Sequence, residues 1–368
     1  MNNNSKPVRE PLIHITKRAS IVWWKSWIIR AVAIIASLIV SALVIVLLTK
    51  YNPLQVYAEM FEGNFGSSRK IWVLLQNLAM LLCISLAVTP AFKMKFWNLG
   101  AEGQVLVGGL ASAACMFYVK DALPNVLLII IMLVASILSG IIWGLIPAVF
   151  KAKWNTNESL FTLMMNYIAI QLVSFFIMLW VPSGSSVMGI INQSSKSGWL
   201  PDLFGQKYLF NILIVAIVTI VMFIYLKYSK QGYEISVVGE SENTARYVGI
   251  SVKKVIIRTM IISGGISGLA GFLLVAGTNH TVSKNIAGGM GFTAIMVSWL
   301  AKFNPILMVI TSFLIVFLQK GASEIATTFR LNESISDILT GIILFFIIGC
   351  EFFINYKINL RHKNKEGK

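Results

Sequence analysis

The sequence predicts an all-α polytopic membrane protein with about ten transmembrane helices and both termini in the cytoplasm. Its 368 residues are 57% hydrophobic and only 12% charged, and the mean hydropathy is +0.76. A soluble domain is roughly a quarter charged. Apolar runs of about 20 residues, each long enough to cross about 30 Å of hydrocarbon, recur along the whole chain. The longest polar interval, residues 227–255, is too short for a soluble domain of ordinary size.

Ten apolar segments are the predicted spans. They cover residues 28–49, 71–91, 98–118, 125–150, 159–181, 207–227, 257–278, 287–301, 304–321 and 334–355. The third and the eighth give the weakest signal because they are rich in glycine and poor in bulky apolar side chains. The first is too long for the core of a signal peptide, so we expect it to remain in the protein.

The basic residues predict the orientation. Net charge is +16, and with a cytoplasmic N-terminus 22 of the 31 lysines and arginines fall on the inner side. Basic residues concentrate in the cytoplasmic loops of membrane proteins, so this charge indicates topology and not nucleic-acid binding. We expect a cytoplasmic arm (1–27), a transmembrane domain (28–356) with a cytoplasmic segment at 228–256, and a basic cytoplasmic tail (357–368).

The sequence contains no set of residues typical of an enzyme or a metal site. Cys83, Cys115 and Cys350 lie in apolar segments and lack metal-ligand spacing, so we expect ordinary core residues. No G-x-x-x-x-G-K-[ST] phosphate-binding loop is present. We therefore predict no catalytic residue, metal or cofactor in this chain.

The cytoplasmic segment predicts a short helix beneath the membrane. Ser241 can cap its start, and Gly249 follows it at the position where a left-handed residue ends a helix. Ser251 can cap the next helix, which leads into the membrane. The apolar side chains expected to be partly exposed are Ala245, Tyr247, Val248 and Ile250. Such a surface is either a solvated turn or a docking site for a cytoplasmic protein.

A single carboxylate, Glu102, lies in the glycine-rich third span, and an ionisable residue in a span is costly. Two interpretations compete. Glu102 either caps the start of its own helix and pairs with Lys93 or Lys95, or it lines a translocation path. Because it lies about four residues into the span, the first interpretation is favoured. A structural hinge formed by Asn98, Gly100, Glu102 and Gly103 is then expected.

Deeper polar side chains are better candidates for lining a path. They are Gln76, Asn77, Asn166, Tyr167 and Gln171. The alternative is that these groups only bridge neighbouring helices, at about 0.6 kcal/mol each. The outer loop 182–206 is equally open to two interpretations, a simple connection or a surface for an external partner.

Three separated blocks carry a family resemblance. They read "FWNLGAEGQVLVGGLASA" (96–113), "NESLFTLMMNYIA" (157–169) and "GYEISVVGESENTARYVGISVKKVIIRTMIISGGISGLAG" (232–271). In this order they resemble ABC-transporter permeases of the branched-chain amino acid/ribose/simple-sugar superfamily, and within it the nucleoside and simple-sugar permease group.

The resemblance implies a bacterial multi-pass membrane subunit of an ATP-driven importer for nucleosides or simple sugars. Its implied partners are a second permease, expected to be a related chain, two ATP-binding cassette domains that hold ATP and Mg²⁺, and an extracellular substrate-binding lipoprotein. The segment 241–249 would be the helix that couples the permease to the ATPase. Its implied coupling residues are Ser241, Glu242, Ala245, Arg246, Tyr247 and Gly249. Glu242 and Arg246 would be rim contacts and Tyr247 a buried anchor of the docked complex.

Other transport classes fit the sequence less well. An ion-coupled secondary transporter of small polar solutes is the main alternative, but we find no ionisable residue at mid-depth of a well-defined span. A channel is commonly built on charged rings or carbonyl filters, and neither is recognisable here.

Overall fold

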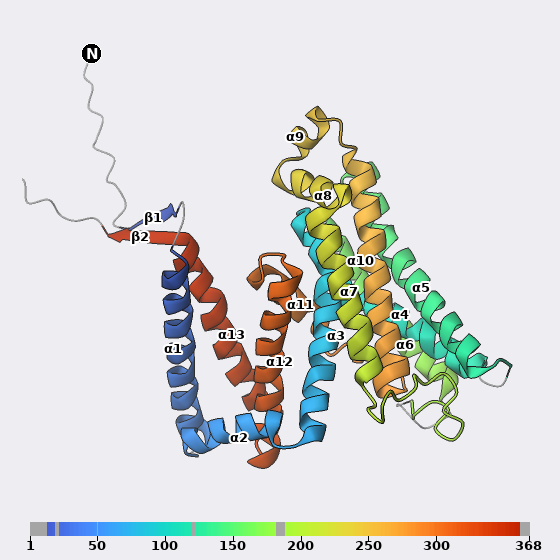
Figure 1. Cartoon of the computed structure of the whole chain (residues 1–368), viewed down its shortest axis with the longest axis horizontal. Coiled ribbons are helices and arrows are strands. Elements are labelled where there is room, and N and C mark those ends of the chain that lie inside the picture. Colours follow the sequence, from blue (N-terminus) through green and yellow to red (C-terminus); the bar gives the residue numbers. More distant parts are fainter. Residues whose placement is uncertain (1–12, 19–21, 50, 120–121, 182–187, 361–368) are drawn as a thin grey trace, which may run out of the picture. The chain divides into compact units, whose positions relative to one another are not determined.

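The computed structural model describes residues 13–18, 22–49, 51–119, 122–181 and 188–360, and in these it is almost entirely helical (Figure 1). Its helices are α1 (Trp23–Thr49), α2 (Pro53–Phe65), α3 (Ser68–Lys93), α4 (Ala101–Tyr118), α5 (Asn125–Trp154), α6 (Glu158–Trp180), α7 (Leu209–Tyr228), α8 (Lys230–Glu240), α9 (Glu242–Tyr247), α10 (Val252–Leu274), the π-helix η1 (Val275–Asn279), α11 (Met290–Leu300), α12 (Pro305–Thr328) and α13 (Glu333–Asn355). Two short strands, β1 (Ile13–Lys17) and β2 (Tyr356–Leu360), complete the described elements.

The chain forms two compact units. One comprises Met1–Gly63 and Leu318–Lys368, and the other Asn64–Phe317. In the first unit α1 packs along α13, and Arg30 forms an ion pair of 2.6 Å with Glu351. Strand β1 pairs antiparallel with β2, which places the two ends of the described chain beside each other.

The second unit is built around α10, which packs against α3, α4 and α5. Glycines make this close packing possible. Gly264 packs against the backbone of Gly140 on α5. Gly268 lies against both Ser136 of α5 and Gly108 of α4. Small residues at helix contacts let backbones approach closely, which is how helices gain packing energy in lipid.

The helices agree with the predicted class, and the number of ten spans stays a prediction. Each predicted span overlaps one helix, but among the described residues eight helices are long and apolar enough to cross a membrane. The two exceptions are α4 and α11, which correspond to the glycine-rich third and eighth segments. With 11 residues, α11 is only about 16 Å long at 1.5 Å per residue, too short to cross by itself.

Helix starts follow the local sequence. The hydroxyl of Ser67 accepts from the amide of Lys70 at the start of α3, and Asn157 accepts from the amide of Leu160 at the start of α6. Pro305 is the first residue of α12, as predicted for a helix beginning there.

Four elements were missed by the sequence interpretation. Helix α2 lies between the first two predicted spans, α8 precedes the predicted cytoplasmic helix, and β1 and β2 form from the arm and the tail. In the outer loop 182–206, residues 182–187 are outside the described part, as are residues 1–12 of the arm and 361–368 of the tail.

Candidate functional site

Two short helices, α8 and α9, project from the end of the second unit (Figure 1). We call residues 229–250 the α8–α9 module. Ser229 caps α8 by accepting from the amide of Gly232 at 2.9 Å, and Ser241 caps α9 by accepting from the amide of Thr244 at 3.3 Å. Gly249 has a φ of +80°, so the predicted left-handed helix end is present. Ser251 occupies the N-cap position of α10 but makes no side-chain capping hydrogen bond.

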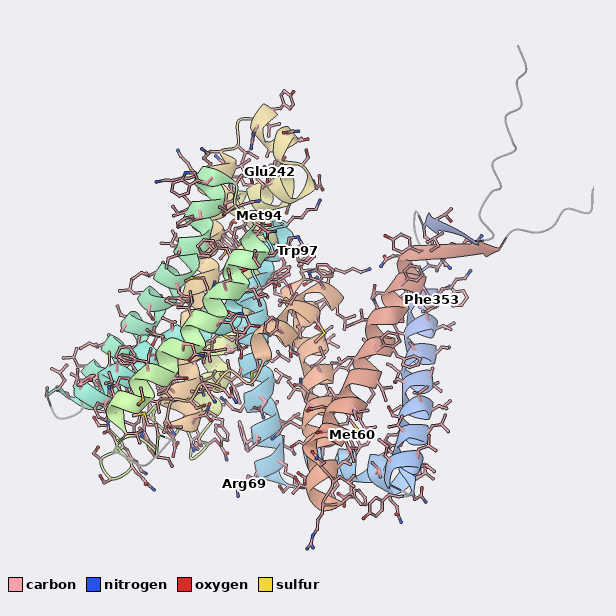
Figure 2. The ribbon with its side chains drawn as sticks, turned by 180° about the vertical axis from the view of Figure 1, so that it is seen from behind. Met60, Arg69, Met94, Trp97, Glu242 and Phe353 are labelled. Carbon is pink, nitrogen blue, oxygen red and sulfur yellow. The ribbon has the colours of Figure 1, made fainter. Side chains whose placement is uncertain are left out.

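An apolar core holds the module on the ends of the membrane helices. Ile235, Val238 and Ala245 of the module are buried together with Met94 and Phe96, which follow α3. The expectation that Ala245 is partly exposed is therefore wrong, because its methyl group faces this core and is fully buried. Figure 2 shows Met94 at the base of the module, with Glu242 of α9 beyond it.

The outer surface of α9 is open. Tyr247 is 92% exposed and Val248 is 62% exposed. Beside them Arg246 and Glu242 form an exposed ion pair of 3.4 Å, one helical turn apart. The arrangement is a rigidly anchored short helix that presents an aromatic side chain with a charged pair beside it.

A second ion pair joins the module to α10 and was not predicted. Arg258 donates to Glu234 of α8 at 2.8 Å, and both side chains are largely shielded from solvent. Since Glu234 and Arg258 are 24 residues apart, no local spacing signals this contact. The pair links α8 directly to the second turn of α10.

The chain between α3 and α4 turns back and is held by side-chain hydrogen bonds. Asn98 accepts from the amide of Gly100 at 3.0 Å and donates to Ser263 of α10 at 3.2 Å. Gln104 also donates to Asn98, at 3.4 Å. A β-carbon at Gly100 would lie 3.0 Å from the backbone carbonyl oxygen of Thr162, a tight contact that glycine avoids.

Two residues of α6 complete the start of α4. Asn166 accepts from the amide of Gly103 at 2.8 Å and donates to the carbonyl of Leu99 at 2.7 Å. Thr162 accepts from the amide of Leu99 at 3.1 Å. These bonds satisfy backbone groups that a helix start leaves unpaired. Asn166, considered above as a path residue, thus bridges α6 to the region of the predicted hinge.

Glu102 caps a helix, but a different one from that predicted. Its carboxylate accepts from the amides of Gly289 at 2.9 Å and Gly291 at 2.7 Å, at the start of α11. The predicted pairing with Lys93 or Lys95 is wrong, because neither lysine forms an ion pair with Glu102 in the described structure. A carboxylate at a helix N-terminus is favourable, since it meets free N–H groups and the positive end of the helix dipole.

A second polar cluster surrounds η1, at the end of α10 away from the module. Gln76 and Asn211 both donate to the hydroxyl of Thr278, at 2.5 and 3.2 Å. The side-chain oxygens of Gln76 and Asn211 are buried and accept no hydrogen bond from any described residue. A π-helical turn at this point is of interest because such turns are frequent at functional sites. Asn211 and Thr278 were missed by sequence reasoning.

The remaining path candidates do not join this cluster. Asn77 donates to the carbonyl of Val73 in its own helix, and Tyr167 and Gln171 lie on the exposed face of α6. No group of three or more metal-ligating side chains occurs among the described residues. Within the part that the structure describes, the cluster around η1 consists of neutral hydrogen-bonding side chains.

A match to a known protein family covers most of the chain. Residues 71–348 match the family described as "Branched-chain amino acid transport system / permease component". This range includes the second unit from residue 71 onward, all of α12 and most of α13.

Several individual proteins are similar over almost the whole chain. A glucose ABC transporter permease of Haloferax volcanii is 25% identical, with 95% of this chain and 94% of the relative covered. A guanosine ABC transporter permease of Bacillus subtilis is 28% identical over 87% of this chain and 92% of the relative. A nucleoside ABC transporter permease of Lactococcus lactis is 28% identical over 94% of this chain and 92% of the relative.

Proposed function

The chain belongs to the family of permease components of branched-chain amino acid transport systems, and on that premise we propose that it carries nucleosides inward as part of an ATP-driven importer. Family members are transport subunits and not catalysts, so ATP hydrolysis lies in a separate subunit. The eight apolar helices of the described residues fit a multi-pass membrane subunit.

The proposed substrate class rests on relatives together with the η1 cluster. Relatives named for guanosine and for nucleosides are each 28% identical to this chain, and one named for glucose is 25% identical. Nucleosides and simple sugars share several hydroxyl groups. The unpaired oxygens of Gln76 and Asn211 can accept hydrogen bonds from such hydroxyls. A cluster of neutral amides suits a neutral polar solute, since it offers partners without a charge to neutralise.

The observation that carries the mechanism is the α8–α9 module. Its inner face is buried against Met94, Phe96 and the start of α10, while Tyr247 is exposed at its tip. We infer that α9 docks into a partner ATPase with Tyr247 as the anchor and the Glu242–Arg246 pair at the rim. Closure of the ATPase dimer would then move α8 and α9 as one body, and the Arg258–Glu234 pair would pass the movement to α10.

The remaining partners follow from the family. Members of ABC permease families work with an ATPase and a substrate-binding component. We propose an extracellular binding lipoprotein that contacts the outer surface of the second unit, a second permease subunit that is a related chain, and two ATP-binding cassette domains that hold ATP and Mg²⁺.

Uptake of radiolabelled guanosine and uridine by cells that express the complete transporter tests this proposal. A matched strain carries an ATPase subunit that binds but does not hydrolyse ATP. We expect uptake that depends on ATP hydrolysis and is competed by other nucleosides. Uptake that survives the inactive ATPase and disappears with a proton uncoupler would contradict an ATP-driven importer. ATP-dependent uptake of glucose or pentoses without nucleoside uptake would contradict the substrate class alone.

A further inference from the structure

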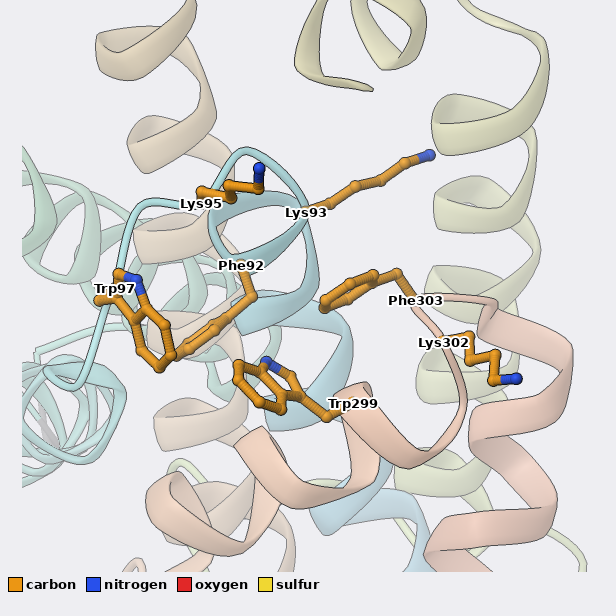
Figure 3. Close-up of a pocket in the computed structure, with 7 residues that line it drawn as sticks. All are labelled: Phe92, Lys93, Lys95, Trp97, Trp299, Lys302 and Phe303. Carbon is orange, nitrogen blue, oxygen red and sulfur yellow. The ribbon is translucent and has the colours of Figure 1, made fainter. Parts of the chain in front are cut away.

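A cavity of about 440 Å³ opens beside the turn that follows α3, within the second unit. Its apolar walls are four aromatic rings, from Phe92, Trp97, Trp299 and Phe303 (Figure 3). The rings of Trp97 and Trp299 are 5.3 Å apart, and Phe92 packs edge-on against both. Cavities of about 300–1,000 Å³ are the usual size for binding a small molecule.

Three lysines surround these rings: Lys93, Lys95 and Lys302. None of them forms an ion pair with a carboxylate in the described part of the chain. Lys93 donates to the carbonyl of Leu226 at 3.4 Å, and Lys95 and Lys302 are exposed. The cavity lining therefore carries three positive charges without an acidic residue, a combination that favours an anionic ligand.

The cavity lies at the ends of membrane helices. The apolar helix α3 ends at Lys93 and α11 ends at Leu300, and the lining residues lie in the last turns of these helices or directly after them. Trp97 is 42% exposed and Trp299 is 50% exposed. Exposed tryptophans at this position are typical of the boundary between hydrocarbon and water, where their rings contact the glycerol region of lipids.

The contacts of the turn that follows α3 indicate on which side of the membrane the cavity lies. Gly239 of α8 packs directly on the carbonyl of Lys93, so the cavity is on the same side as the α8–α9 module. The basic residues of the sequence favour the cytoplasm for this side. Anionic lipids are recognised by basic pockets between transmembrane helices on the cytoplasmic side.

The backbone of this turn is unusual. Lys95, Lys302 and Phe303 have φ values of 60°, 50° and 60°, in the left-handed region that residues other than glycine seldom adopt. Such a conformation carries a cost in free energy and persists where its surroundings or a function maintain it. Two of these three residues, Lys95 and Lys302, are among the lysines that line the aromatic cavity.

From these observations we propose that the cavity binds the headgroup of an anionic phospholipid of the cytoplasmic leaflet. The positive charge of the lysines would attract the phosphate, and the glycerol and first methylene groups would contact Trp97 and Trp299. The same turn contributes Met94 and Phe96 to the core beneath the module, so the bound lipid would lie next to the support of α9. Recognition of this lipid does not depend on which solute is transported.

Native mass spectrometry of the purified full-length chain in a neutral detergent tests the proposal. The chain is titrated with phosphatidylglycerol and with phosphatidylcholine of the same acyl chains, and with inorganic phosphate as a competitor. We expect a saturable phosphatidylglycerol adduct, a much weaker phosphatidylcholine adduct and no displacement by phosphate at millimolar concentration. In the double variant K95Q/K302Q the affinity for phosphatidylglycerol should fall about 30-fold, because each lysine near an anionic surface contributes about a factor of five.

The matched control is K253Q/K254Q. It removes two exposed lysines at the start of α10, on the same side of the membrane but outside the cavity. This variant should retain the wild-type affinity for phosphatidylglycerol. Three outcomes would overturn the proposal: equal affinity for the two lipids, an equal loss in both double variants, or full displacement of the lipid by inorganic phosphate. The last would identify the cavity as a site for a soluble anion.

Discussion

The carboxylate of Glu102 accepts a hydrogen bond of 2.7 Å from the backbone amide of Gly291, which joins the first turn of α4 to the first turn of α11. The two residues are 189 positions apart in the sequence, and the contact needs glycine at position 291. A β-carbon at residue 291 would lie 2.6 Å from the amide nitrogen of Glu102. Glu102 thereby serves as the N-terminal cap of the short helix α11.

Replacing Glu102 with glutamine should therefore destabilise the protein. The neutral side chain loses the charge that interacts with the helix start, and its NH₂ group can replace one of the two accepting oxygens. We expect a loss of about 1–3 kcal/mol in the free energy of unfolding, the range for hydrogen bonds to a charged group. Unfolding of the purified protein in detergent measures this loss, with the exposed Glu62→Gln as the control. Equal stability of the two variants would show that the cap is energetically irrelevant.

Glu102 also shows what sequence can and cannot predict here. The cost of an isolated carboxylate among apolar residues correctly indicated a helix-capping role. The partner could not be predicted, because Gly289 and Gly291 reach it only through packing of distant helices. In contrast, Ser241 and Gly249 were predicted correctly, since caps depend on neighbours three to five residues away.

The η1 cluster illustrates the same limit. Gln76 was recognised as a polar residue in an apolar span, but its partners Thr278 and Asn211 stand near the ends of other helices. Polar residues at helix ends look like ordinary boundary residues in a sequence. The two glycine-rich predicted spans show a related limit. The glycines that lower the hydropathy of α4 make contacts with α10, so tertiary packing and not apolar length holds this helix in place.

A pair of neighbouring glycines tests the close packing of α5 and α10. A β-carbon on Gly264 would collide with the backbone carbonyl of Gly140, whereas one on Gly265 would meet only Ile141 and its neighbours on α5, at an ordinary distance of 3.4 Å or more. Backbone cannot move aside as a flexible side chain can. We expect Gly264→Ala to cost about 1–3 kcal/mol of stability or to prevent folding, and Gly265→Ala to be tolerated. The yield and unfolding temperature of monodisperse protein distinguish the two. Similar behaviour of both variants would refute this contact between the two helices.

The coupling role of α9 is tested at its tip. Tyr247→Ala removes a ring that contacts little within the chain, so folding and membrane insertion should be unchanged. If Tyr247 anchors the ATPase, ATP-dependent uptake and permease-stimulated ATP hydrolysis should both fall, by about 30-fold for a loss of about 2 kcal/mol. The control is Tyr228→Ala, which removes a ring that is 67% exposed at the end of α7. Wild-type hydrolysis and uptake in the Tyr247 variant would exclude this anchor.

The η1 cluster predicts an effect on uptake. Substitution of Gln76 or Asn211 with leucine removes the buried oxygens that are free to accept from a solute hydroxyl. Each change should lower the initial rate of uptake at subsaturating solute about fivefold, the equivalent of one hydrogen bond of about 1 kcal/mol. Asn77→Leu is the comparison, because that amide is bonded within its own helix. If uptake is unchanged while the unfolding temperature falls, the cluster only stabilises the fold.

A pH effect is predicted at His280, which follows η1. Its ring stacks on Trp199 at 3.7 Å, the residue is only 5% exposed, and neither ring nitrogen has a hydrogen-bond partner among the described residues. Burial and then the ammonium of Lys207 lower the pKa of His280 from 6.5 to about 4, with Asp202 and the backbone of Ala276 opposing this shift. The neutral ring is thus the form that the folded state favours.

The sign of the effect follows from the two pKa values. Above pH 6.5 the ring is neutral in both folded and unfolded states, and its contribution to stability is complete. As the pH falls from 6.5 to about 4 the unfolded state binds the proton first, so stability decreases, by at most about 3 kcal/mol. Unfolding temperatures of wild type and His280→Gln measured across this range isolate the effect, because other groups titrate equally in both. Parallel curves for the two proteins would mean that His280 titrates normally and that its stack with Trp199 tolerates the charged ring.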